Sequence, residues 1–463
     1  MPLTLPVISI APYVHRTDTN EAERRATSAA LHEACVNYGF FYLDISSFAS
    51  HEETDELERL AHQFFELPQD AKDVISIENE DLARGYQRLK QNVTNGKADA
   101  HEGIDFYRPV EQPEKGWPLW GENQWPSDEV VPKFKATYEV WVEKMKQLGL
   151  IVMEAMAAGL GLTAEEWLDL RSKVDNSFWV MRVIGYPPLP NDHDGFSCGS
   201  HKDYGCLTFL HADSTPSALQ VFLPASTPAL ASAQSANAKH GDAASANGLE
   251  DTLPREQGVE EGVWLMADPK PGCVVCNIGE MWEIWTQGLY RSTLHRVIHR
   301  GSNYRVSVPF FFEPNYTARI APLPAAIRAW EKLGGQATTP PPNVKRDPVV
   351  YGDFLRQKVA GNFEESGPDL RPPYPPTISP THTMDPVPTF VRGETVWLWT
   401  SDSGNSWTQA TVLSINNAAK HESARNISYN VIFFDRSNRK VATTVGPALI
   451  RRCSPVMREG ITA

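Results

Sequence analysis

The stretch from residue 178 to residue 315 is built from short runs of Val, Phe, Leu and Thr that are separated by Gly, Pro and Asp. This texture is typical of short β strands joined by turns. Apolar residues at helical spacing come before it, over residues 21–38, 53–65 and 131–160. Helices followed by many short strands predict a mainly β fold with flanking helices, either a jelly roll or a sandwich.

Two segments of low complexity divide the 463-residue chain. Residues 225–258 are rich in Ala and Ser and almost free of large apolar side chains, so we expect a disordered insert there. Residues 367–388 contain eight prolines and predict a semi-rigid linker. Strand-like runs resume after the linker. The expected domains are residues 1–366, made of a helical part (about 1–177) and a jelly-roll core (about 178–315), and a small barrel over residues 389–458.

Composition excludes several classes of protein. Hydrophobic residues make up 41% and charged residues 22% of the chain, as in ordinary globular proteins. The net charge of −14 disfavours a protein that binds nucleic acid through bulk positive charge. The longest apolar run, residues 148–162, contains Glu154 and is too short to span a bilayer, so we expect no membrane association. Six scattered cysteines and an N-terminus without a signal-peptide pattern predict a cytoplasmic protein.

Two His-x-Asp pairs are candidates for metal binding. His201 and Asp203 are two residues apart, which places both side chains on one face of an extended segment. A second histidine from a distant strand would complete a 2-His-1-carboxylate site with three open positions, as a ferrous oxygenase needs. The pair His211 and Asp213 has the same spacing. Either pair alone could equally be a polar contact on the surface or in a turn.

The segments that surround the first pair match a known family in sequence order. The matching segments are residues 5–10, 38–41, 84–86, 102–105, 199–210, 277–285, 290–297, 304–314 and 350–354. They resemble the iron- and 2-oxoglutarate-dependent oxygenases of the isopenicillin N synthase-like superfamily. The resemblance implies a double-stranded β-helix, which is a jelly roll, with N-terminal helices packed outside it.

The resemblance also implies the residues that bind iron. These are His201, Asp203 and His295, which would form the catalytic metal site. His299 lies four residues beyond His295 and would face the same side of a strand. We prefer His295 because it lies in the Ser-Thr-Leu-His-Arg-Val match.

Three further residues match the family's co-substrate site. Arg305 and Ser307 correspond to an Arg-x-Ser pair that binds the distal carboxylate of 2-oxoglutarate. A guanidinium fork and a hydroxyl on one strand face suit a carboxylate. Tyr186 matches a tyrosine that helps to hold the co-substrate in relatives. In enzymes of the isopenicillin N synthase type, such an Arg-x-Ser pair can bind a substrate carboxylate instead.

Departures from the family pattern leave the metal site intact. Ile184 stands where many relatives have asparagine, which removes one polar contact and makes the role of Tyr186 less defined. Glu280 stands where aspartate is commoner. Cys273 and Cys276 have the spacing of a thiol-metal or redox pair, but their context favours packing within a strand.

The implied activity is that of an Fe(II)- and 2-oxoglutarate-dependent dioxygenase. It would use O2 to hydroxylate, desaturate or cyclise a small-molecule substrate and would release succinate and CO2. An iron oxidase that does not use 2-oxoglutarate is the first alternative, and a scaffold without activity is another. The complete set of His201, Asp203, His295 and Arg305 argues against the scaffold.

The C-terminal runs resemble the SH3-like barrels of the Tudor and agenet type. Such barrels can bind methylated lysine or arginine in an aromatic cage. Candidates for the cage are Trp399, Trp407, Tyr429 and Phe434, of which strand alternation assigns half to the core. Arg436 stands where an aromatic residue is common, so a barrel that binds a protein partner is preferred to a complete cage. A reader of a macromolecule that the oxygenase part modifies is the alternative.

Overall fold

The computed structural model describes residues 3–94, 96–113, 119–190, 193, 195–227, 230, 261–332 and 348–360, together with the C-terminal strands 395–400, 406–416, 428–434, 440–445 and 450–452. The chain divides into two compact units, residues 1–368 and residues 369–463. Most of the predicted insert and the whole predicted linker lie outside the described residues.

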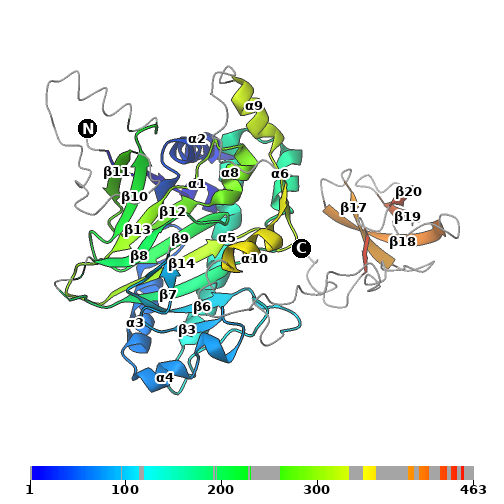
Figure 1. The fold of residues 1–463 in the computed structure, drawn as a ribbon. Helices are drawn as coiled ribbons and strands as arrows, with labels where there is room; N and C mark the ends of the chain where they lie inside the picture. Colours follow the sequence, from blue (N-terminus) through cyan, green and yellow to red (C-terminus); the bar gives the residue numbers. More distant parts are fainter. Residues whose placement is uncertain are drawn as a thin grey trace, which may run out of the picture. The chain divides into compact units, whose positions relative to one another are not determined.

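Helices of the first unit lie mostly in its N-terminal part (Figure 1). They are α1 (Ala11–Val14), α2 (Glu21–Asn37), α3 (His51–Phe65), α4 (Gln69–Asp73), α5 (Phe134–Leu160), α6 (Ala164–Arg171), α8 (Glu280–Thr286), α9 (Pro324–Lys332) and α10 (Tyr351–Ala360), with single turns η1 (Asp18–Asn20) and η2 (Ile77–Asn79). In the described part of the chain, no helix is both long enough and apolar enough to cross a membrane.

Two sheets form the centre of this unit. The larger sheet has the strand order β1 (Val7–Ser9), β2 (Phe40–Asp44), β12 (Cys273–Ile278), β9 (Leu207–Ala212), β14 (Arg305–Phe312), β7 (Val180–Tyr186), β6 (Glu102–Tyr107) and β3 (Gly85–Gln87). The smaller sheet has the order β11 (Gly262–Met266), β10 (Leu219–Pro224), β13 (His295–Ile298) and β8 (Phe196–His201). Two short hairpins complete the unit, β4 (Val93–Thr94) with β5 (Lys97–Ala98) and β15 (Arg319–Ile320) with β16 (Val349–Val350).

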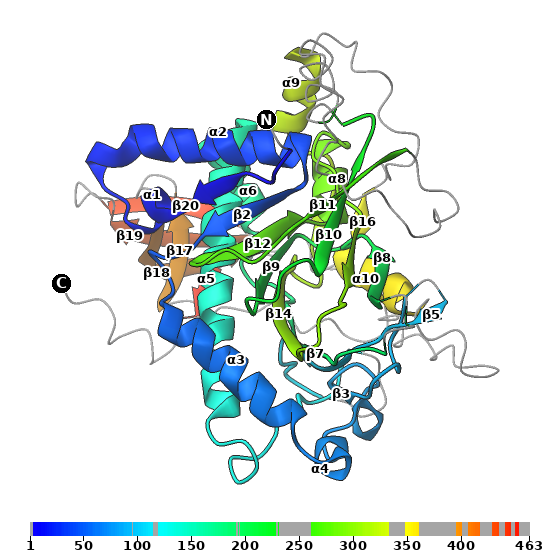
Figure 2. The ribbon, with the colours of Figure 1, turned by 90° about the vertical axis from the view of Figure 1, so that its left-hand side faces the viewer.

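Helices α2, α3 and α5 cover the outer face of the larger sheet (Figure 2). The start of α3 is fixed by a capping box, in which Glu53 N donates to Ser50 Oγ at 3.3 Å and Ser50 N donates to Glu53 Oε2 at 2.9 Å. Helix α5 packs closely on β14, because a Cβ on Gly149 would overlap the ring of Phe312. The main hydrophobic core lies in this helix–sheet layer.

The inner face of the larger sheet packs against the smaller sheet. On β7, Met181 and Val183 belong to the helix–sheet core, whereas Ile184 and Tyr186 belong to a second core. That second core also contains Val221 of the smaller sheet and therefore joins the two sheets face to face. The result is a mainly β fold with flanking helices and a jelly-roll core, as the sequence predicted.

The larger sheet also contains strands from the N-terminal part. Residues 39–44 have the pattern of a short strand in the sequence and contain β2, whereas β1, β3 and β6, which also come from residues 1–177, were not predicted as strands. Within the expected β region, residues 280–286 form the short helix α8. Cys273 and Cys276 lie in β12, and both are free thiols.

The second unit contains an antiparallel five-stranded sheet. Its order is β20 (Lys440–Val445), β19 (Ser428–Phe434), β18 (Ser406–Asn416), β17 (Thr395–Thr400) and β21 (Ile450–Arg452). β20 was not among the strand-like runs found in the sequence. The four residues proposed for an aromatic cage lie on β17, β18 and β19, whose strand pairing but not side chains the structure describes, and the SH3-like barrel stays a prediction.

Candidate metal and co-substrate site

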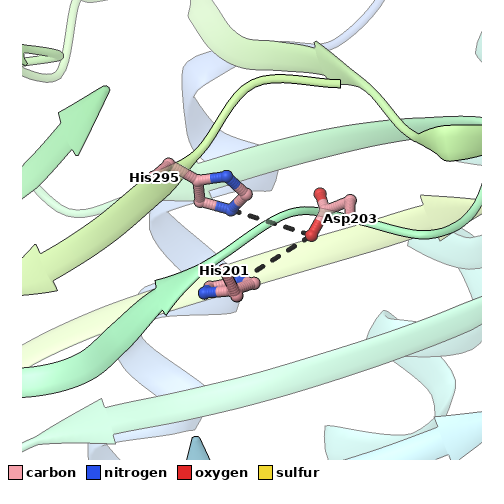
Figure 3. A group of neighbouring side chains, drawn as sticks. All are labelled: His201, Asp203 and His295. Carbon is pink, nitrogen blue, oxygen red and sulfur yellow. Dashed lines mark ion pairs between the residues drawn. The ribbon is translucent and has the colours of Figure 1, made fainter. Parts of the chain in front are cut away.

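Three possible metal ligands meet at the end of β8. His201 is the last residue of β8, and Asp203 lies two residues further on. His295 begins β13, where it lies opposite His201. Asp203 Oδ1 is 3.8 Å from His201 Nε2 and 3.7 Å from His295 Nε2. The three ligand atoms lie within 4.8 Å of one another, so a single cation can reach all three (Figure 3).

Backbone carbonyls fix the orientation of both imidazole rings. His201 Nδ1 donates to Gly199 O at 2.8 Å, and His295 Nδ1 donates to Thr293 O at 3.1 Å. With the proton on Nδ1, the lone pair of each Nε2 is free for a metal. The β8–β13 pairing is irregular beside His295, which is how bulges commonly redirect side chains at active sites.

Asp203 is held so that one of its oxygens stays available. Its Oδ2 accepts a hydrogen bond from Asn277 Nδ2 at 2.6 Å and another from Thr208 Oγ1. Its backbone carbonyl accepts from Glu280 N at 2.9 Å and from Ser292 Oγ at 3.0 Å. Asp203 Oδ1 is therefore the oxygen that faces the histidines.

Burial and neighbouring groups shift the pKa of all three residues. Burial raises the pKa of Asp203, but the two histidines and the hydrogen bonds from Thr208 and Asn277 outweigh it and hold the pKa below the usual value. Burial, and then the charge on His201, lower the pKa of His295 to about 4. Burial opposes protonation of His201, but Cys198 and Asp203 raise its pKa to about 10. Because a metal binds the neutral form of an imidazole, protonation of His201 would compete with metal binding.

The remaining candidate ligands from the sequence have hydrogen-bond partners elsewhere. His299 Nε2 donates to Asn303 O at 2.8 Å. His211 Nε2 lies 2.9 Å from Glu58 Oε1. Asp213 accepts hydrogen bonds from backbone amides, among them that of Val306 at 2.7 Å. His299 and the second His-x-Asp pair are therefore not part of the metal group.

Arg305 and Ser307 lie on the inner face of β14 and are each only 1% exposed. Arg305 Nε and Nη1 and Ser307 Oγ have no hydrogen-bond partner among the described residues. Tyr186 lies opposite Arg305 in the β14–β7 pair, and the centre of its ring is 4.7 Å from the guanidinium carbon. Burial raises the pKa of Tyr186, although the charge of Arg305 opposes this. A buried guanidinium with unpaired donors is costly unless an acceptor, best an anion, binds to it.

A small pocket adjoins Arg305. Its lining includes Leu210 and Ala212 of β9, Val275 of β12 and Leu219 of β10. It therefore lies between the two sheets, with an apolar wall and a cation at one side. This is the composition of a site for a small carboxylate.

Sequence reasoning missed the residues that hold Asp203. Asn277 and Thr208 lie on neighbouring strands, β12 and β9; Thr208 is five residues after Asp203, whereas Asn277 reaches it from 74 residues away. The only signal in the sequence was that Asn277 is a polar residue at the end of an apolar strand. Glu280, noted as a departure, contributes its backbone amide, which any residue type supplies.

Comparisons with known proteins agree with this geometry. Residues 5–128 match the family described as "non-haem dioxygenase in morphine synthesis N-terminal", and residues 238–314 match the 2OG-Fe(II) oxygenase superfamily. Homoarginine-6-hydroxylase 2-ODD-233 of Oryza sativa subsp. japonica is 32% identical to this chain over 370 residues, which is 78% of this chain and 97% of that protein. Homoarginine-6-hydroxylase 2-ODD-C23 of Glycine max is 34% identical over 375 residues, with the same coverage of both chains.

Solved structures show the same fold. A full-length Neurospora crassa protein in complex with alpha-KG has a TM-score of 0.58 at 23% identity, and the match covers 78% of this chain and 97% of that chain.

A jelly roll that brings two histidines and an aspartate together has the ligand set of a non-haem iron oxygenase. The chain belongs to the 2OG-Fe(II) oxygenase superfamily. It is a dioxygenase that uses Fe(II), 2-oxoglutarate and O2.

Proposed function

We propose that this chain is a hydroxylase whose substrate is homoarginine or a closely related amino acid that carries a guanidinium group. The observation that carries the co-substrate part of the proposal is the buried, unpaired guanidinium of Arg305 in the same jelly roll as the His-Asp-His group. The substrate part is supported by the homoarginine-6-hydroxylases, which match this chain at 32–34% identity.

In this proposal His201, Asp203 and His295 bind the iron through two Nε2 atoms and Asp203 Oδ1. Two nitrogens and one oxygen on one side leave the other positions of a six-coordinate ion open. When bound, iron and 2-oxoglutarate would supply the activation of O2 that turns a substrate C–H bond into C–OH, with one oxygen atom going to the product and the other to the succinate that forms with CO2. The protein's own part is to hold these ligands, to place the substrate and to exclude water.

Arg305 and Ser307 would bind the distal carboxylate of 2-oxoglutarate. The guanidinium has two donors without a partner among the described residues, Nε and Nη1, and the Ser307 hydroxyl lies on the same strand face. The ring of Tyr186 would keep the guanidinium flat against β7 by a cation–π contact.

We also propose that the second unit is an SH3-like barrel that binds a protein partner. The antiparallel order of its five strands supports this proposal. The net charge of +4 over residues 389–463 would favour an acidic partner.

Anaerobic spectroscopy tests the co-substrate assignment. Ferrous iron followed by 2-oxoglutarate should give a visible metal-to-ligand charge-transfer band. Arg305→Met should raise the 2-oxoglutarate concentration needed for half of this band by about 100-fold, because one buried charge pair is lost. Arg319→Met, a matched change at an exposed arginine, should leave that concentration unchanged. Iron bound without a band, or a band insensitive to Arg305→Met, would overturn the assignment.

Mass spectrometry tests the substrate. Homoarginine incubated with the loaded enzyme in air should gain one oxygen atom, with one succinate formed for each product molecule. His201→Ala should abolish both products. Succinate release that homoarginine does not stimulate would overturn the substrate, although not the class of enzyme.

A further inference from the structure

Strands β6 and β7 bring a second set of charged groups to the inside of the jelly roll. Side chains alternate between the two faces of a strand. Since Met181 and Val183 face the helices, Arg182 faces the interior, together with Ile184 and Tyr186. Asp105 lies directly opposite Arg182 in the β6–β7 pair.

The two charged residues form a buried ion pair in which the guanidinium donates only through Nε. Arg182 Nε donates to Asp105 Oδ1 at 2.7 Å, and Gln87 Nε2 donates to Asp105 Oδ2 at 3.1 Å. The exposed fraction of the side chain is 19% for Arg182 and 7% for Asp105. Neither terminal nitrogen of Arg182 donates a hydrogen bond to any residue that the structure describes. A pair that served stability alone would be expected to use both prongs of the guanidinium fork.

His101 adds an unpaired acceptor to the inner face of β6 and β7, which we call the β6–β7 wall. It comes just before β6, and its ring centre is 5.6 Å from that of Tyr186. His101 Nδ1 donates to Ser197 O at 2.8 Å, whereas Nε2 is buried and has no partner within the described part of the chain. Burial, and then the charge of Arg182, lower the pKa of His101 to about 4. The ring is therefore neutral, and Nε2 can only accept a hydrogen bond.

This wall adjoins strand β8, which ends at the metal ligand His201. His101 Nδ1 donates to Ser197 O of that strand, and Asp99, two residues before His101, accepts a hydrogen bond from Gly199 N of the same strand at 2.9 Å. Arg305 and Ser307 are already assigned to 2-oxoglutarate, which leaves the β6–β7 wall for the second organic ligand.

We propose that His101, Asp105 and Arg182 form the substrate-recognition site. The free nitrogens of Arg182 bind a substrate carboxylate, while Asp105 and His101 Nε2 accept hydrogen bonds from a cationic nitrogen of the substrate. The chemistry that fits this wall is an amino acid with a basic side chain. The inference rests on the proposed function and adds to it the residues that select the substrate.

Binding to the anaerobic Fe(II)–2-oxoglutarate complex tests this site, because substrate binding perturbs the charge-transfer band without turnover. The probes are homoarginine, its methyl ester, which lacks the carboxylate charge, and homocitrulline, in which a neutral urea replaces the guanidinium. The wild-type protein should prefer homoarginine to each of the other two by about 30-fold or more.

Arg182→Gln and Asp105→Asn should each lose one of these two binding preferences and keep the other. Arg182→Gln should bind homoarginine and its ester almost equally, and Asp105→Asn should bind homoarginine and homocitrulline almost equally. His101→Phe should weaken binding of homoarginine, whose cationic nitrogens donate. Arg328→Gln, which breaks the exposed pair with Glu166 instead, should keep both preferences.

The 2-oxoglutarate band itself reports whether each variant folds. Arg182→Gln and Asp105→Asn variants that form the band but keep wild-type preferences would show a structural ion pair and overturn the inference. A wild-type protein that binds none of homoarginine, arginine and lysine would overturn it as well. Preference for arginine or lysine over homoarginine would overturn only the proposed substrate, and the variants would then be read with that amino acid and its ester.

Discussion

Glu313 is a buried carboxyl group immediately behind the metal-binding segment. Its Oε2 accepts a hydrogen bond from Cys206 N at 2.9 Å. Only glycine fits at position 205, because a Cβ there would overlap the carboxylate. Burial is the main reason that the pKa of Glu313 rises to about 8. The close contact fixes the turn that follows Asp203.

This raised pKa predicts a pH-dependent stability. Between the unfolded pKa of 4.5 and about 8, the folded protein keeps a proton on Glu313 that the unfolded chain has lost. The free energy of unfolding should therefore fall as pH rises through this window, by about 2 kcal/mol between pH 6 and pH 8. Glu313→Gln should remove this decrease while it keeps an acceptor for Cys206 N. Urea denaturation of the metal-free protein at both pH values measures it.

Glu139→Gln, a matched change at an exposed glutamate of α5, should keep the wild-type decrease. An equal decrease in Glu313→Gln would show that another group is responsible.

At the scale of the elements, the short β4–β5 hairpin supports the metal ligand His201. Asp99, just after β5, accepts a hydrogen bond from Gly199 N at 2.9 Å, and Gly199 O in turn accepts from His201 Nδ1. Thr94 Oγ1 donates to the other oxygen of Asp99 at 2.7 Å. A Cβ on Gly199 would come within 2.9 Å of Thr94 Cγ2, so glycine allows this close approach.

Asp99→Ala should therefore lower the affinity for iron by about tenfold, because the carbonyl that orients His201 loses its support. Titration with Mn(II), followed by its electron paramagnetic resonance signal, measures the affinity without catalysis. Asp73→Ala, which removes the ion pair with Arg88 and a hydrogen bond from Gln69 on the surface, serves as the control. Unchanged affinity in Asp99→Ala would show that β8 holds His201 unaided.

Elements were predicted well where a periodic pattern was long. The structure has α2 over Glu21–Asn37 and α5 over Phe134–Leu160, close to the helices expected from apolar spacing. Strand β6 was missed as a strand because one of its faces carries Gly103 and Asp105, residue types that are depleted in strands. Helix α8 has only seven residues, too few to show a helical period inside a β region.

The site residues also fall into those that the sequence could identify and those that it could not. His201, Asp203, His295, Arg305 and Ser307 could be found because motifs carry them in the sequence. Asn277 and His101 could not, since each acts through a contact that exists only after distant strands pair.

For the whole molecule, the described site residues all lie in the first unit. The homoarginine-6-hydroxylases of rice and soybean match 78% of this chain yet 97% of their own length. A chain that ends at residue 368 should therefore keep the dioxygenase activity. Succinate release by the truncated and complete chains measures this, with His201→Ala in the truncated chain as the inactive control. Loss of activity in a truncated chain that still forms the 2-oxoglutarate band would assign the second unit a part in turnover.

Pro224 and Gly262 face each other across the β10–β11 pair, and Ala225 N donates to Glu261 O at 2.6 Å. The chain thus leaves the edge of the smaller sheet and re-enters it at adjacent points. Because the entropy of closing a loop grows only with the logarithm of its length, the segment between these points can lengthen or shorten at little cost to the jelly roll. A fluorescent reporter inserted between these two points should therefore leave the enzyme folded.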